Sequence, residues 1–151
     1  MKSDTAPKTA RILLIEDNAA DVDLMKYALD KGHFRYELIT LKDGAEALAF
    51  IRGEGKYAHA AQPGLIVMDL HFPKSDGMEV LEEIRGNPKF AELLVAVLSS
   101  SVSPEEKNRI AALKRTCFIA KPLDLDGFMK VGKTIKSLAL DGKASAAGAA
   151  S

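Results

Sequence analysis

The chain has 151 residues, enough for one domain with a sizeable hydrophobic core, and its 21 basic residues are balanced by 21 acidic ones. This balance excludes a general positive field for nucleic acid, and every apolar run is far shorter than the roughly 20 residues of a membrane span. Residues 1–9 are polar and Cys117 is the single cysteine, so we expect no signal segment, no internal disulfide and a cytoplasmic location.

Five short apolar runs predict β-strands. The run at 65–68 is continuous, which is typical of a strand buried on both faces of a parallel sheet. The run at 36–41 is more mixed, as expected for a strand at the edge of a sheet. The five predicted strands are residues 11–15, 36–41, 65–68, 93–98 and 117–120.

Each predicted strand is followed by a capping residue and an amphipathic stretch, which predicts five helices. Ser103 has Pro104 after it and Glu106 three residues on, a pattern that favours a capping box. Residues 53–64, between the second helix and the third strand, predict a long loop. The five predicted caps are Asn18, Asp43, Asp76, Ser103 and Asp124.

Strands and helices alternate along the chain, and no internal repeat interrupts them. This rhythm predicts an α/β fold, a doubly wound five-stranded parallel sheet with five helices covering both faces. We place this domain at residues 10–140. Residues 1–9 are expected to be a disordered lead, and residues 141–151, which are mostly Gly, Ala and Ser, a flexible tail.

Four of the five predicted strands end in a chemically reactive side chain. The carboxyl ends of parallel strands meet at one edge of the sheet, where open α/β folds bind their ligands. Taken singly, these residues have ordinary interpretations as helix caps, turn residues or surface charges. Their joint placement at strand ends predicts a site formed by Glu16, Asp17, Asp69, Ser99 and Lys121.

The three carboxylates of this group predict a divalent cation. Close carboxylates repel by several kcal/mol, as an order of magnitude, at an effective dielectric constant near 20. Mg²⁺ relieves such repulsion, because it prefers oxygen ligands and commonly takes one or two carboxylates together with water and phosphate oxygens. We expect Asp17 and Asp69 to be direct Mg²⁺ ligands and Glu16 to be a ligand through water.

The two remaining groups predict phosphoryl chemistry at Asp69. A carboxylate can accept a phosphoryl group, and the Lys121 ammonium and the Ser99 hydroxyl are suited to stabilise the charge on its oxygens. The same residue types at the same strand ends therefore predict a metal-dependent aspartyl phosphorylation site.

With these features, the chain resembles the receiver domain of two-component response regulators over about residues 10–140. The resemblance implies a flavodoxin-like sheet with strand order 2-1-3-4-5, Asp69 as phosphoacceptor and the His71 backbone carbonyl as a further Mg²⁺ ligand. It also implies a sensor histidine kinase as partner. The matching residues are Ile15-Glu16-Asp17-Asn18, Asp69, Pro73-Lys74-Ser75-Asp76-Gly77, Ser99 and Lys121-Pro122.

A finer resemblance concerns residues 50–58, which are similar to those of stand-alone receivers that serve bacterial phytochromes. The resemblance also implies that Ser99 and Phe118 form the switch. Phe118 stands where the family often has Tyr, and Ser99 where Thr is commoner. Lys114 follows Leu113 where the family often has a left-handed Gly.

These observations favour a response regulator that accepts a phosphoryl group and relays it as a surface change, with no catalysis beyond its own phosphorylation and dephosphorylation. One alternative is a degenerate receiver that acts only as a binding module. Another is an aspartyl-phosphate hydrolase, but haloacid-type phosphatases carry a second Asp two residues after the nucleophile, and His71 occupies that position.

The signal is expected to leave through the fourth helix, the fifth strand and the fifth helix, as a homodimer contact. The fifth strand is apolar and comes last in the implied order, so it lies at a sheet edge, and such edges tend to be covered or paired. Charges of both signs, including Lys107 and Asp126, flank it and suit a self-complementary contact. A solvated face without a partner is the alternative interpretation.

Overall fold

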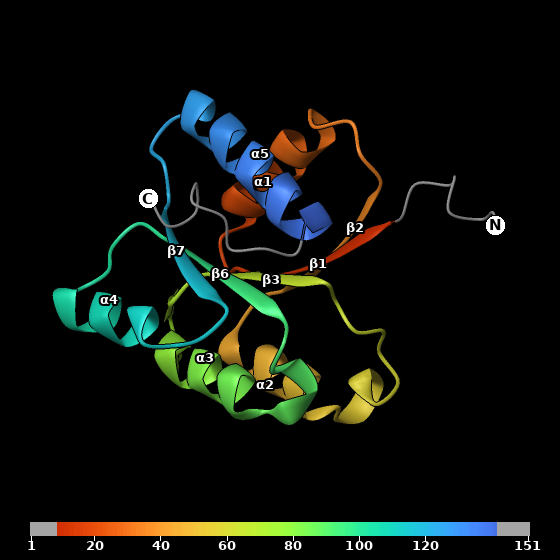
Figure 1. Ribbon diagram of the computed structural model, residues 1–151, viewed down its shortest axis with the longest axis vertical. Coiled ribbons are helices and arrows are strands. Elements are labelled where there is room, and N and C mark those ends of the chain that lie inside the picture. The colour runs from red at the N-terminus through yellow and green to blue at the C-terminus, as the bar shows by residue number, and fades with distance from the viewer. Residues whose placement is uncertain (1–8, 142–151) are drawn as a thin grey trace.

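The computed structural model describes residues 9–141, which form a five-stranded sheet between two layers of helices (Figure 1). All neighbouring strands are parallel and follow the order β2-β1-β3-β6-β7. The labels β4 and β5 belong to a separate hairpin, so β6 and β7 are the fourth and fifth strands of this sheet. The implied order 2-1-3-4-5 is therefore confirmed. The sheet strands are β1 (Ala10–Ile15), β2 (Tyr36–Leu41), β3 (Leu65–Met68), β6 (Leu94–Ser99) and β7 (Thr116–Ala120).

One face of the sheet is covered by α1 (Ala19–Asp30) and α5 (Leu125–Asp141) (Figure 1). The other face is covered by α2 (Gly44–Arg52), α3 (Gly77–Gly86) and α4 (Pro104–Ala111). Alternate strand residues serve the two cores: Ile12 and Leu14 face α1 and α5, while Leu13 and Ile15 face the opposite layer. All four residues of β3 are buried, as the continuous apolar run predicts.

The five predicted caps are confirmed. Each side chain accepts a hydrogen bond from a backbone N–H in the first turn of its helix. Ser103 and Glu106 form the predicted capping box. Two short 3-10 helices were not predicted: η2 (Gly55–Tyr57) lies inside the loop expected at 53–64, and η3 (Pro88–Phe90) precedes β6.

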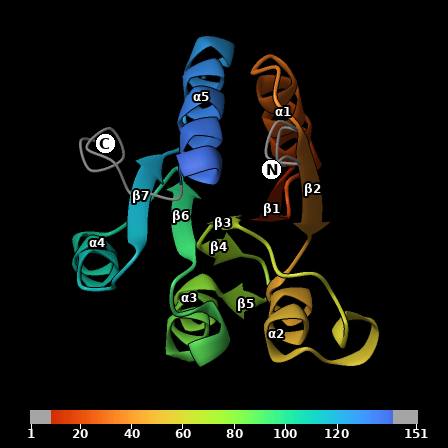
Figure 2. The ribbon, with the colours of Figure 1, turned by 45° about the vertical axis from the view of Figure 1, so that its right-hand side comes forward.

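A short antiparallel hairpin follows the third sheet strand and was also not predicted. Its strands are β4 (His71–Phe72) and β5 (Ser75–Asp76), and it lies beside α2 (Figure 2). Gly77, at its end, could not carry a side chain, since a Cβ there would lie 2.1 Å from the Leu70 carbonyl oxygen. This tight packing holds the hairpin against the segment that follows β3.

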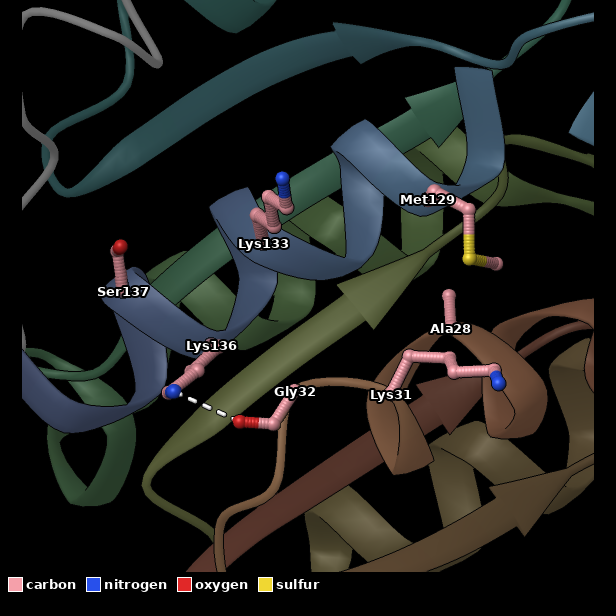
Figure 3. A pocket seen from close by; sticks show the side chains of 7 residues that line it. All are labelled: Ala28, Lys31, Gly32, Met129, Lys133, Lys136 and Ser137. Carbon is pink, nitrogen blue, oxygen red and sulfur yellow. Dashed lines mark hydrogen bonds between the residues drawn. The ribbon is translucent and has the colours of Figure 1, made fainter. Parts of the chain in front are cut away.

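Helices α1 and α5 approach each other closely where Gly132 meets Ala28. A Cβ on Gly132 would lie 2.7 Å from the Ala28 Cβ, so the position requires glycine. Beside this contact, residues of both helices line a pocket of about 390 Å³ (Figure 3). Across it, the Lys136 ammonium donates a 2.8 Å hydrogen bond to the Gly32 carbonyl and ties α5 to the end of α1.

The turn between α4 and β7 contains a left-handed residue, but it is Arg115, with φ of 55°, rather than Lys114. The turn is held by Arg85 of α3. Its guanidinium donates to the carbonyl oxygens of Lys114 and Arg115, and to those of Phe90 and Leu93 in the segment just before β6. Arg85 therefore joins α3 to the amino ends of both β6 and β7.

The predicted lead and tail lie outside the described residues, except for Thr9 and for Asp141, which ends α5. Between residues 9 and 141, no helix combines the length and apolar character that crossing a membrane requires.

Candidate functional site

Three carboxylates meet where β1 and β3 end. Glu16 and Asp17 follow β1, Asp69 follows β3, and one oxygen from each lies within 4.8 Å of the others. The backbone keeps the two ends in register, because the Asp69 N–H donates to the Ile15 carbonyl. Glu16 and Asp69 are buried, whereas Asp17 is exposed. Oxygen-only donors at this spacing fit a hard divalent cation, as the sequence predicts.

Lys121 comes from the end of β7 and reaches into this group of carboxylates. Its Nζ lies 2.8 Å from Glu16 Oε1, 2.9 Å from Asp21 Oδ2 and 3.0 Å from Asp69 Oδ2. Burial disfavours the charged form, but the three hydrogen bonds outweigh it and raise the pKa of Lys121 above its ordinary value. The lysine is therefore a cation that partly compensates the acidic site.

Both oxygens of Asp69 accept hydrogen bonds from the surrounding residues. Oδ1 accepts from the Ser99 hydroxyl at 2.9 Å and from the backbone N–H groups of Leu70 and His71, and Oδ2 accepts from Lys121. Burial alone would raise the pKa of Asp69, but the Lys121 and backbone hydrogen bonds lower it below its ordinary value. Asp69 is thus an ionised carboxylate held in a fixed orientation at neutral pH.

Glu16 differs from Asp69 in the direction of its pKa shift. Its carboxylate accepts hydrogen bonds from Lys121 and from the Asn18 backbone N–H, but burial outweighs them and raises the pKa of Glu16. The two buried carboxylates of the group are therefore shifted in opposite directions.

The other predicted residues lie around Asp69. Ser99 ends β6 and is fully buried against Asp69. Phe118, in β7, is half-buried against the core on the α4 side, and the Lys107 ammonium lies 5.7 Å from its ring centroid. The imidazole of His71 is exposed and turns toward the Ser101 carbonyl. The role of the His71 backbone carbonyl as a metal ligand stays a prediction.

Asp21, which the structure places against Lys121, was not predicted from the sequence. Asp21 lies in the first turn of α1, where its backbone N–H bonds the Asn18 cap. A carboxylate in a first helical turn has an ordinary explanation in the helix dipole, so nothing local distinguished it. Only the fold brings it to a lysine 100 positions further along the chain.

Comparisons with known proteins agree with this geometry. The model of the response regulator receiver domain matches residues 12–132. Response regulator Rcp1 of Synechocystis is 36% identical over 139 residues, covering 92% of this chain and 95% of the relative.

Solved structures give the same result. The phosphorylated cyanobacterial phytochrome response regulator RcpA has a TM-score of 0.83 at 38% identity, covering 90% of this chain and 97% of that one. The Mn²⁺-bound form of Rcp1 has a TM-score of 0.81 at 36% identity, covering 89% of this chain and 96% of that one. The chain belongs to the response regulator receiver family.

Proposed function

We propose that Asp69 accepts a phosphoryl group from a sensor histidine kinase and that this protein relays the signal as a change of surface. The observation that supports this best is the pair of contacts on Asp69, with the Ser99 hydroxyl on one oxygen and the Lys121 ammonium on the other. These groups can hold the oxygens of a phosphoryl group at the same place.

The transfer needs little covalent chemistry from the protein. A bond forms between an Asp69 oxygen and phosphorus while the P–N bond to the kinase histidine breaks, and its electron pair stays on the imidazole. The lowered pKa of Asp69 keeps the attacking carboxylate ionised. The charge that remains on the phosphoryl oxygens lies beside Lys121 and Ser99.

We propose Mg²⁺ as the physiological cation of this site, held directly by Asp17, Asp69 and the His71 backbone carbonyl, and through water by Glu16. The oxygen-only donor set and the Mn²⁺-bound form of Rcp1 support a divalent cation. When bound, the cation would supply positive charge for the phosphoryl oxygens.

The phosphoacceptor is tested by intact-mass measurement after incubation with acetyl phosphate and Mg²⁺. We expect wild-type protein to gain one hydroxylamine-sensitive phosphoryl group, and Asp69→Asn to gain none while keeping its circular dichroism spectrum. Asp23→Asn is the matched control, because Asp23 is an exposed carboxylate of α1. An adduct that persists in Asp69→Asn would show that another residue is the acceptor.

We further propose that the kinase partner is a bacterial phytochrome and that the protein acts in the cytoplasm. RcpA is named as a cyanobacterial phytochrome response regulator, and it matches this chain over nearly all of its own length. The receiver family and the intact acidic group of carboxylates favour neither a degenerate binding module nor a hydrolase. We propose no catalytic activity beyond the protein's own phosphorylation and dephosphorylation.

We also propose a homodimer through α4, β7 and α5. In the monomer Cys117 and Ile119 are already buried under α5, so apolar exposure of β7 does not support the contact, and only the flanking charges favour it. Light scattering should detect a dimer that phosphorylation tightens and that Lys107→Glu or Asp126→Lys weakens. A monomer at all concentrations, with and without phosphoryl, would exclude it.

A further inference from the structure

We infer that Asp21 is a positioning residue, which holds the Lys121 ammonium beside Asp69 when other ligands occupy the remaining carboxylate oxygens. The inference rests on the proposed phosphorylation of Asp69 and extends it to a residue of α1. Three hydrogen bonds of the largely shielded Lys121 ammonium support this role.

An ammonium has three N–H donors, and in this structure all three are used. The acceptors are carboxylate oxygens of Glu16, Asp21 and Asp69. Two of the three acceptors, Glu16 and Asp69, also belong to the group of carboxylates that can hold a metal ion. Asp21 lies outside that group as far as the described residues show.

Metal binding and phosphorylation therefore draw on two of the partners of Lys121 but not on the third. A cation would draw on an Asp69 oxygen directly and on Glu16 through water, and phosphorylation would convert Asp69 into an acyl phosphate whose new oxygens need a donor. Asp21 is the carboxylate that can keep its bond to the ammonium throughout, so that the other N–H groups turn toward the phosphoryl oxygens.

The position of Asp21 suits this role. Its backbone is fixed by the Asn18 cap, and the amino end of α1 favours a negative charge there. The Asp21 side chain is 23% exposed and that of Lys121 is 10% exposed, so the ion pair is largely shielded from solvent. Without Asp21, the long lysine side chain would lose the contact that limits its rotation toward solvent.

The first measurement is the rate of Asp69 phosphorylation by acetyl phosphate with saturating Mg²⁺. We expect Asp21→Ala to slow it about tenfold, the size typical of one hydrogen bond to a charged group. Asp23→Ala, on the same helix and exposed, is the matched control and should keep the wild-type rate. An unchanged or faster rate in Asp21→Ala would overturn the inference, the faster rate showing that Asp21 only repels the incoming anion.

A double-mutant cycle separates positioning from a general structural effect. If Asp21 acts through Lys121, Asp21→Ala should have no effect in a Lys121→Ala background. An equal tenfold loss in both backgrounds would show that Asp21 acts elsewhere, and the inference would fall. If wild-type protein gains no phosphoryl group at all, the proposed function itself fails, which distinguishes the two outcomes.

A readout independent of phosphorylation is the ¹⁵N signal of the Lys121 ammonium. Three hydrogen bonds should slow its proton exchange enough for detection by NMR in the wild type, both without metal and with Mg²⁺. Asp21→Ala should broaden this signal, most strongly with Mg²⁺ bound. A signal as sharp as that of the wild type in Asp21→Ala would contradict the inference.

Discussion

Two shielded cations lie at opposite ends of β6 and β7, and their partners differ in kind. Lys121, at the carboxyl ends, bonds three carboxylates. Arg85, at the amino ends, bonds backbone carbonyl oxygens, and its buried Nε has no hydrogen-bond partner among residues 9–141. The first cation can exchange one anion for another, whereas the second is fixed by groups that cannot leave. The same sheet thus has a replaceable charge network at one edge and a permanent one at the other.

The pKa values of Lys121 and Arg85 are shifted in opposite directions. The carboxylates around Lys121 raise its pKa, while burial, together with the neighbouring charge of Arg115, lowers the pKa of Arg85. Lys121 is compensated by carboxylates, and a phosphoryl group can replace some of them as its partner. A cation compensated chiefly by carbonyl dipoles contributes mainly to structure.

The largest effect is expected at Lys121, the cation whose anionic partners can be exchanged. Lys121→Ala should still accept a phosphoryl group on Asp69 but lose phosphorylation-dependent partner binding, because the phosphoryl oxygens then lack the ammonium that we propose couples them to the predicted switch residues Ser99 and Phe118. The measurement is partner affinity by isothermal titration calorimetry, with and without acetyl phosphate. Normal phosphorylation-dependent binding by this variant would refute the coupling.

Arg85→Ala should lower the stability of the fold and leave phosphorylation unchanged. It removes the four hydrogen bonds that tie α3 to the segments before β6 and β7, so we expect the free energy of unfolding to fall by about 3 kcal/mol while the phosphorylation rate stays at the wild-type value. Arg85→Lys should restore little, since a lysine cannot reach four carbonyls in one fork. Urea denaturation measures the first effect, and wild-type stability in Arg85→Ala would remove the distinction between the two cations.

The smallest effect is expected at Asp17, the exposed member of the carboxylate group. Asp17→Asn removes one of three mutually repelling charges, so the melting temperature without metal should rise by about 2 °C. Mg²⁺-dependent phosphorylation should weaken in the same variant. A clear drop in melting temperature would mean that Lys121 already compensates the whole group.

The strand-end residues were predictable because a parallel sheet collects its carboxyl ends at one edge, and each strand was readable from its own apolar run. Asp21 and Arg85 were not predictable in this way. Asp21 meets Lys121 only through the folded sheet, and Arg85 binds backbone carbonyls, which have no sequence signature. The hairpin β4–β5 escaped prediction because strands of two residues leave no periodicity. The left-handed Arg115 escaped because nothing in its side chain marks it.

The division of the core between two faces has a consequence for biosynthesis. Ile12 and Leu14 belong to the first strand made, yet the face to which they contribute is closed by Val131, Ile135 and Leu138 of the last helix. The opposite face receives α2 and α3 while the chain is still growing. A nascent chain can therefore pair β1, β2 and β3 early and cover part of this face with α1, but it presents the part that α5 covers to solvent or chaperones until α5 has been synthesised.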